Sequence, residues 1–416
     1  MNGLTSIFAF LPFRSLPAVT AVCKDWLAAA AQEPSKEEWI DAPSADVPVI
    51  CSSLLRHHVQ SLALTEPCSV ATVLLLQRLP SLKDSILPVD GDNFLHTATQ
   101  MGDDRSAAVG IARMFPRSIN TLLIVLSKCA HPVQAQQLLI DVAARIHQLT
   151  VLHLDFEQAT GSRPQLLPLQ QLAGLTCLQL QGAGWRLTEP LVVELASLSS
   201  LTELNVMSGH HWTPALLAVL ADPAHCKLQR LRHLHCSALH EVSAAHVQAL
   251  SRLPAFSKLE VRHLSPAALP LLASLSALVE LQMTMQGSRP DHLFSAAAAV
   301  PHLAACKLLT SLTLFHCSFD TTDLRTLTSG MLELQALHFV GCELPSLDPL
   351  SEAQRLRTLS LLGASSLGLA ALLPLAACKS LRDLYVSITQ KDRAVARFML
   401  SHADFQHVTH FDICDV

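Results

Sequence analysis

The chain has 416 residues, a formal net charge of −5, 50% hydrophobic residues and only 15% charged residues. One hydrophobic core usually stops growing at roughly 250–300 residues, so this length predicts either several domains or an array of repeats. Lys and Arg form no basic run, and no apolar stretch reaches the roughly 20 residues of a membrane span, so we expect neither a nucleic-acid nor a membrane partner.

Residues 1–40 predict a small helical segment. Apolar residues recur at spacings of three and four from Ile7 to Trp26, with a break at Pro12. This spacing gives each helix one apolar face. Ser35 and Glu38 form a capping box at the start of a further helix.

The same segment resembles an F-box, a helical element of ubiquitin-ligase receptors. The positions that match the family pattern are Ile7, Phe8, Leu11, Pro12, Leu16, Val19, Val22, Cys23, Lys24 and Trp26, with Trp39 in the place of a closing Trp. The resemblance implies that a Skp-type adaptor, and through it a cullin, binds Ile7, Phe8, Leu11, Pro12, Leu16, Val19, Val22 and Trp26. The alternative is that these helices only cap the apolar end of the region that follows.

Residues 41–148 contain irregular copies of a short pattern: an apolar residue, two residues, Leu, one residue and another apolar residue. The copies are Val59-Leu62-Leu64 and Ile119-Leu122-Ile124, with Leu82 and Leu87 near a third. The stretch from Asp90 to Arg105 is interpreted as an exposed loop insertion because it contains Asp-Gly and Gly-Asp-Asp. It lacks the remaining ligands of a calcium loop, so we expect it to be solvated.

From residue 149 to residue 416 the pattern is regular. Its copies begin at Leu149, Leu175, Leu201, Leu231, Phe256, Leu278, Leu309, Leu334, Leu356, Leu381 and Val408. The spacing of about 22–31 residues is close to that of a leucine-rich repeat. The last two apolar positions of each copy alternate with polar residues, which predicts a short strand with one buried face.

A helix is predicted after most of these strands. Thr213-Pro214 and Ser265-Pro266 place an N-cap hydroxyl before a Pro at the first helical position. Thr188, Ser243 and Thr321 lie at comparable places. We therefore expect an α/β leucine-rich-repeat solenoid (horseshoe), with parallel strands on the concave face and helices outside, preceded by the F-box-like segment.

Several of the 12 Cys residues occupy fixed places in the repeat. Cys306 and Cys378 lie three residues before the pattern opens, and Cys317 and Cys342 lie three residues after it. These placements resemble the cysteine-containing subfamily of leucine-rich repeats, which implies half-buried thiols that bond weakly to backbone. The alternative, a zinc site, needs close pairs such as C-x-x-C, and none is present. We expect no metal, no cofactor and a reducing location in the cytoplasm or nucleus.

The sequence contains no motif of a common enzyme. It has no P-loop, no dinucleotide-binding glycine motif and no G-x-S-x-G. His240-Glu241 with His246 has the spacing H-E-x4-H, two residues longer than the H-E-x-x-H of zinc proteases. An F-box followed by leucine-rich repeats resembles the substrate receptor of a cullin-type (SCF-like) ubiquitin ligase, which recruits a protein substrate for ubiquitination. The alternatives are a non-catalytic scaffold in a cytoskeletal or ciliary axonemal assembly, and an inhibitor or GTPase regulator.

Candidate substrate-binding residues are the polar positions between the apolar strand positions. The central candidates are His233, His235, Lys258, Glu260, Arg262, Glu280 and Tyr385. Interface energy is concentrated in few residues, often aromatic or Arg, which singles out Tyr385 and Arg262. For any one of these residues, the alternative is a solvated side chain without a partner.

Overall fold

In the computed structural model the chain forms two compact units, residues 1–210 and residues 211–416. The described residues are 40–42, 60–64, 67–68, 70–101, 104–127, 131–155, 169–181, 187–207, 212–222, 224, 226–235, 242–261, 264–284, 294–363, 369–387 and 405–414. The F-box-like positions from Ile7 to Trp26, with Trp39, lie outside the described residues. The predicted boundaries at residues 40 and 148 stay predictions.

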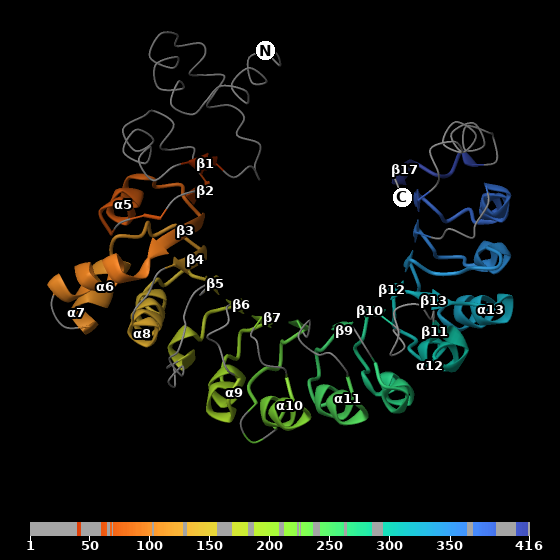
Figure 1. The fold of residues 1–416 in the computed structure, drawn as a ribbon, viewed down its shortest axis with the longest axis horizontal. Helices are drawn as coiled ribbons and strands as arrows, with labels where there is room; N and C mark the ends of the chain where they lie inside the picture. The colour runs from red at the N-terminus through yellow and green to blue at the C-terminus, as the bar shows by residue number, and fades with distance from the viewer. Residues whose placement is uncertain are drawn as a thin grey trace, which may run out of the picture. The chain divides into compact units, whose positions relative to one another are not determined.

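The first unit is a parallel sheet whose strands follow one another in chain order. The strands are β1 (Ile40–Ala42), β2 (Ser61–Leu64), β3 (Asp84–Asp90), β4 (Thr121–Ser127), β5 (Val151–Asp155), β6 (Cys177–Gln181) and β7 (Glu203–Met207). The helical segments between them are α5 (Val70–Leu75), η4 (Leu76–Arg78), α6 (Gly91–Gln100), α7 (Asp104–Ala112), α8 (Pro132–Ala143), η5 (Leu169–Leu172) and α9 (Glu189–Ala196). Figure 1 shows these helices on one side of the strands, as the crossover between parallel strands requires.

The second unit repeats the same arrangement. Its main sheet contains, in order, β8 (His233–His235), β9 (Lys258–Val261), β10 (Glu280–Thr284), β12 (Ser311–Phe315), β14 (Ala336–Val340), β15 (Thr358–Leu362), β16 (Asp383–Ser387) and β17 (His410–Cys414). Its helical segments are α10 (Pro214–Leu220), α11 (Ala244–Leu250), η6 (Pro266–Ser274), η7 (Ala296–Ala298), α12 (Val300–Ala304), α13 (Thr321–Gly330), η8 (Asp348–Glu352) and η9 (Leu369–Ala377). A small parallel pair, β11 (Phe294–Ser295) with β13 (Cys317–Ser318), lies beside them.

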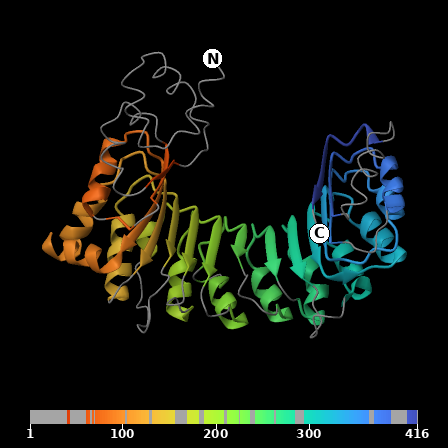
Figure 2. The same cartoon turned by 45° about the horizontal axis from the view of Figure 1, so that its top comes forward.

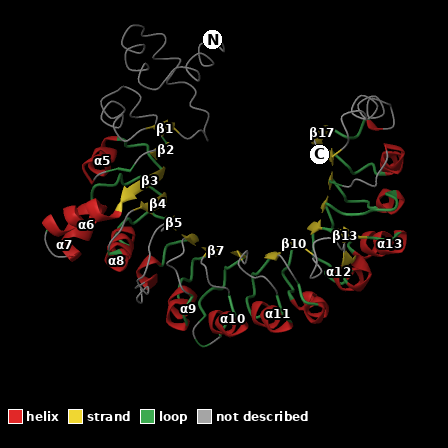
Figure 3. Cartoon of the chain, viewed as in Figure 1, coloured by secondary structure: helices red, strands yellow, loops and turns green. Residues whose placement is uncertain are grey.

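The leucines of the repeat pattern form the core of each unit. Leu312, Leu337, Leu359 and Leu384 occupy the same register on successive strands, and all are fully buried. Figure 2 shows the strands lying side by side, and Figure 3 shows the helices along one face of them. The predicted α/β leucine-rich-repeat solenoid is therefore confirmed by the strand ladder itself, because each apolar column covers the next.

The predicted helix starts are confirmed in position at Thr188, Thr213, Ser243 and Ser265, but the hydroxyls of Thr188 and Ser265 make no capping hydrogen bond, and Thr321 is corrected. The Thr213 hydroxyl accepts a hydrogen bond from the Leu216 amide at 3.2 Å. The cap of α13 is Asp320 and not Thr321: its carboxylate accepts from the Asp323 amide at 2.6 Å, and Asp323 accepts from the Asp320 amide at 3.1 Å. The Asp320 carboxylate supplies the acceptor that a capping box needs, so Thr321 becomes the first helical residue.

A histidine fills the capping box of α11. Ser243 donates its backbone N–H to Nδ1 of His246 at 3.0 Å. Nδ1 is therefore an acceptor, which places the ring proton on Nε2, and Nε2 lies 3.1 Å from the carbonyl oxygen of Trp212. The His246 side chain is buried, so one ring joins the start of this helix to the preceding repeat.

Three neighbouring strands of the main sheet in the second unit, β12, β14 and β15, are each followed by a residue with left-handed backbone. His316, Gly341 and Gly363 have φ values of 54°, 62° and 67°. The His316 amide donates to Val340 O at 2.9 Å, and the Gly341 amide donates to Leu362 O at 2.7 Å. A Cβ at Gly341 would lie 2.8 Å from Nδ1 of His316, so glycine is favoured there by both backbone and space.

The repeat cysteines are more deeply buried than we predict from the sequence. Cys317 and Cys342 are 0% and 1% exposed, not half-buried, because they point into the core after the left-handed turn. Their bonding to backbone is confirmed: Sγ of Cys317 donates to Phe315 O at 3.3 Å, and Sγ of Cys342 donates to Leu314 O at 3.3 Å. The described cysteines form no disulfide with one another.

The loop predicted from Asp90 to Arg105 is wrong for most of its length. Residues 91–100 form α6 and residue 104 begins α7. Phe94 and Ala98 lie four residues apart and are both buried. This apolar face outweighs the turn preference of the Asp-Gly pair before it. No helix among the described residues is long and apolar enough to cross a membrane.

Candidate protein-binding surface

Each strand presents alternate side chains to the face that the helices do not cover, here called the open face. In β5, β6, β10, β12, β14 and β16 the residues of this face are half-buried, while those between them are buried. Neighbouring strands are about 4.8 Å apart, so open-face residues at one register form a close row. The candidate substrate-binding residues predicted from the sequence lie on β8, β9, β10 and β16, except Arg262, which follows β9 directly in the sequence.

Four of the candidates form a charged cluster on β8, β9 and β10 of the second unit. Nζ of Lys258 lies 3.0 Å from Oε1 of Glu260 and 3.1 Å from Oε1 of Glu280. Nε2 of His233 lies 4.0 Å from Oε1 of Glu260. Lys258 therefore holds together two carboxylates from neighbouring strands, and the cluster is compact and only partly open to solvent.

Burial and nearby charges together shift the pKa values of Lys258 in this cluster and of His338 on β14, outside it. Burial lowers the pKa of Lys258, but hydrogen bonds to Glu260 and Glu280 and their charges outweigh it, so the net shift is upward. Burial lowers the pKa of His338 on β14, and the charge of Glu280 opposes that shift in part. At neutral pH Lys258 of the cluster is therefore charged, and His338, on β14 outside the cluster, is neutral.

The remaining candidates lie apart from the cluster or outside the described part. His235 is in register with Glu260, but its side chain is not described. Arg262 lies outside the described residues. Tyr385 is on β16, separated from β10 by three strands, and its ring centroid lies 5.6 Å from that of His410.

Sequence reasoning missed an apolar patch on the open face of the first unit. Ile86 and Pro88 of β3 pair with Leu123 and Val125 of β4, and all four are half-buried. Val151 of β5 pairs with Thr121 at the edge of this patch. The signal was present as the unbroken apolar run from Leu122 to Leu126, which is typical of a parallel strand covered on both faces.

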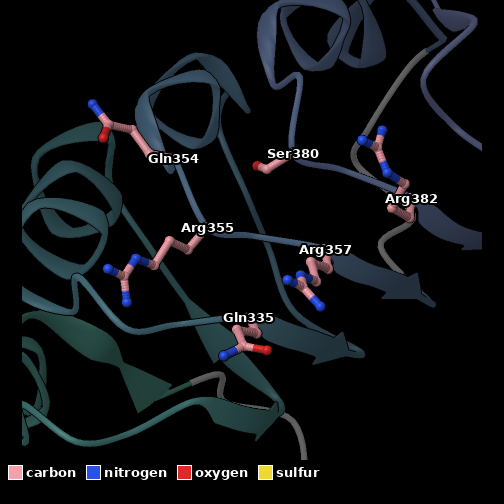
Figure 4. Close-up of a pocket in the computed structure, with 6 residues that line it drawn as sticks. All are labelled: Gln335, Gln354, Arg355, Arg357, Ser380 and Arg382. Carbon is pink, nitrogen blue, oxygen red and sulfur yellow. The ribbon is translucent and has the colours of Figure 1, made fainter.

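A pocket of about 480 Å³ lies at the starts of β14, β15 and β16. It is lined by Gln335, Gln354, Arg355, Arg357, Ser380 and Arg382. Figure 4 shows the three guanidinium groups spread around the pocket instead of meeting at one point. Arg355 pairs with Glu333, and Arg382 donates to His407 O at 2.8 Å. Two of the three guanidinium groups therefore already have partners within the protein.

The described residues contain no group of three or more His, Cys, Asp or Glu that could hold a metal ion. His246, which the sequence places near a metalloprotease-like motif, serves as the helix cap described above. Among the described residues, the charged cluster and the apolar patch are the candidate binding surfaces on the open face.

Comparisons with known proteins give no family. No family model and no curated protein matches the sequence. Among solved structures, an internalin from Listeria monocytogenes is similar with a TM-score of 0.43 and 14% identity, over 90% of this chain and 95% of that chain. TLR13 in its complex with ssRNA13 is similar with a TM-score of 0.43 and 13% identity, over 92% of this chain and 57% of that chain.

Proposed function

We propose that this protein is a non-catalytic, protein-binding substrate receptor of a cullin-type ubiquitin ligase. Its F-box-like segment docks a Skp-type adaptor, and its leucine-rich repeats bind the substrate. The observation that carries the binding role is the open strand face, which presents a compact charged cluster and an apolar patch from regular strands. Side chains on a rigid sheet are held in place before a partner arrives, which reduces the ordering cost of binding.

The adaptor-binding part of the proposal is supported by the sequence resemblance over residues 4–40. Ile7, Phe8, Leu11 and Trp26 are its apolar anchors. The receptor performs no covalent step. It raises the effective concentration of the substrate beside a ubiquitin-charged enzyme that the adaptor and cullin hold.

The experiment is a pull-down of the full chain with a purified Skp-type adaptor. Wild type is compared with the Phe8→Ala/Trp26→Ala double variant, and we expect binding by the first and loss of binding by the second. Leu332→Ala/Leu373→Ala is a matched control, because it also removes two large apolar side chains, both exposed on the repeats. Circular dichroism melts establish that all three proteins are folded.

Absence of adaptor binding by folded wild-type protein contradicts the receptor proposal. The alternative of a scaffold in a cytoskeletal or ciliary axonemal assembly would then be preferred, because it needs only the repeats. Equal binding by wild type and the double variant also contradicts the proposed docking residues.

A further inference from the structure

The open face of the first unit differs in chemistry from the charged cluster of the second. Ile86, Pro88, Leu123 and Val125 are half-buried apolar residues on two neighbouring strands, on the face that the described helices do not cover. The opposite face of the same strands is already a core, with Leu87, Leu122 and Ile124 buried there. An apolar patch on the uncovered face of a sheet indicates a binding surface, because water contact with it is unfavourable.

Carboxylates border this patch. Asp84 and Asp90 begin and end β3, and Asp155 ends β5 in register with Val125. No Lys or Arg occupies an open-face position of the described strands β2 to β7. Lys83 precedes β3 at its edge and is exposed, with Nζ 3.4 Å from Oε1 of Gln60.

The other titratable residue beside the patch adds no positive charge at neutral pH. His153 lies between Leu123 and Gln179 on the sheet. Burial lowers its pKa, and the charge of Glu203 only partly opposes this shift. The face is therefore apolar at its centre and acidic around it. A positively charged partner would therefore be attracted to this face, and a negatively charged partner would be repelled.

We infer that the open face of the first unit binds a basic, apolar segment of a partner protein, in which large apolar side chains are flanked by Lys or Arg. The apolar side chains pack on Ile86, Leu123 and Val125, and the basic side chains reach Asp84, Asp90 and Asp155. This inference rests on the proposed function, because it names the substrate chemistry that the receptor recognises. A second copy of this chain is a poor occupant, because two such faces would bring like charges together.

The probe is an unbiased library of displayed 12-residue peptides, selected on the full chain. We expect the enriched peptides to contain Leu, Ile, Phe or Trp flanked by Lys or Arg. Affinities of two enriched peptides are then measured by fluorescence anisotropy. Leu123→Asp should weaken them at least tenfold, and the milder Leu123→Thr at least threefold. Asp155→Lys should weaken them and also reduce their dependence on salt.

The matched control is Lys258→Glu with Glu280→Lys, which exchanges two charges of the second-unit cluster and should leave the affinities within twofold. Melting curves confirm that each variant is folded. Enrichment of acidic or wholly polar peptides, or no enrichment over an unrelated protein, overturns the inference.

Two further outcomes separate this inference from the proposed function. If the peptides bind more weakly to the Lys258→Glu/Glu280→Lys variant but not to Leu123→Asp, their binding site is the charged cluster. That result overturns the inference, while the receptor function stands. Light scattering that finds a dimer in wild type and a monomer in Leu123→Asp identifies a second copy as the occupant, which also overturns it. The adaptor pull-down is independent of all these variants.

Discussion

Replacing Gly341 by Ala tests the row of residues with left-handed backbone that follow β12, β14 and β15. Gly341 has a φ of 62°, and an Ala in left-handed backbone costs about 1–2 kcal/mol. The loss of chain freedom in the unfolded state offsets about 0.4–1 kcal/mol of this. These two terms also apply to Gly363, whose φ is 67° and whose added Cβ would meet only ordinary contacts at 3.4 Å and 3.5 Å.

The two positions differ in one contact. The Cβ added at Gly341 would lie 2.8 Å from Nδ1 of His316, so the ring must move. The His316 side chain is exposed and can rotate, which limits the additional cost to about 0.5–1.5 kcal/mol, the range of an off-rotamer side chain. We therefore expect Gly363→Ala to destabilise by about 0.5–1 kcal/mol and Gly341→Ala by about 1–2.5 kcal/mol.

The assay is urea unfolding of the full chain followed by circular dichroism, with the free energy taken from linear extrapolation. Both substitutions are repeated in a His316→Gly background, which removes the ring. In that background the cost of Gly341→Ala should fall to that of Gly363→Ala. An unchanged cost of Gly341→Ala in the two backgrounds would refute the contact with His316, because coupled neighbours are expected to be non-additive.

Two other predictions concern histidines. His246→Ala should lower the free energy of unfolding by about 2–4 kcal/mol, because two buried hydrogen bonds are lost. His246→Gln should retain the hydrogen bond from Ser243 and should therefore lose less. Equal losses of the two variants in urea melts would contradict the capping role. The lowered pKa of His338 means that the unfolded chain binds its proton more tightly, so the stability of the folded state should fall as pH drops below 6.5. The difference in melting temperature between pH 7 and pH 5 should therefore be smaller in His338→Gln than in wild type. The same difference in both proteins would contradict this role of His338.

The repeat register could be predicted from the sequence because each strand carries two Leu-type residues at one spacing. Leu152 and Leu154, or Leu312 and Leu314, identify a buried face without knowledge of the neighbouring strands. Helix α6 was not predicted, because its turn-forming first residues conceal the buried pair Phe94 and Ala98. Local signals of this kind are ambiguous until the packing partner is known.

The candidate surface was less predictable than the fold. The contacts of Lys258 with Glu260 and Glu280 join two strands, and pattern alone placed these residues on one face without indicating which would meet. The apolar patch was missed because Leu123 and Val125 extend a run that already explains the core. Only the register and the position of the helices separate the side chains that fill the core from those that remain uncovered.

The chain-order pairing of the strands also bears on how this protein is made. Leu312 pairs with Leu337, and Leu359 pairs with Leu384, so these contacts close loops of 25 residues, and the other described sheet contacts close loops of 22 to 37 residues. Sheets with such short closures fold faster than those that must join distant strands. During synthesis on the ribosome, each repeat of a unit can dock on its predecessor soon after it emerges, and the growing protein always exposes just one unfinished edge.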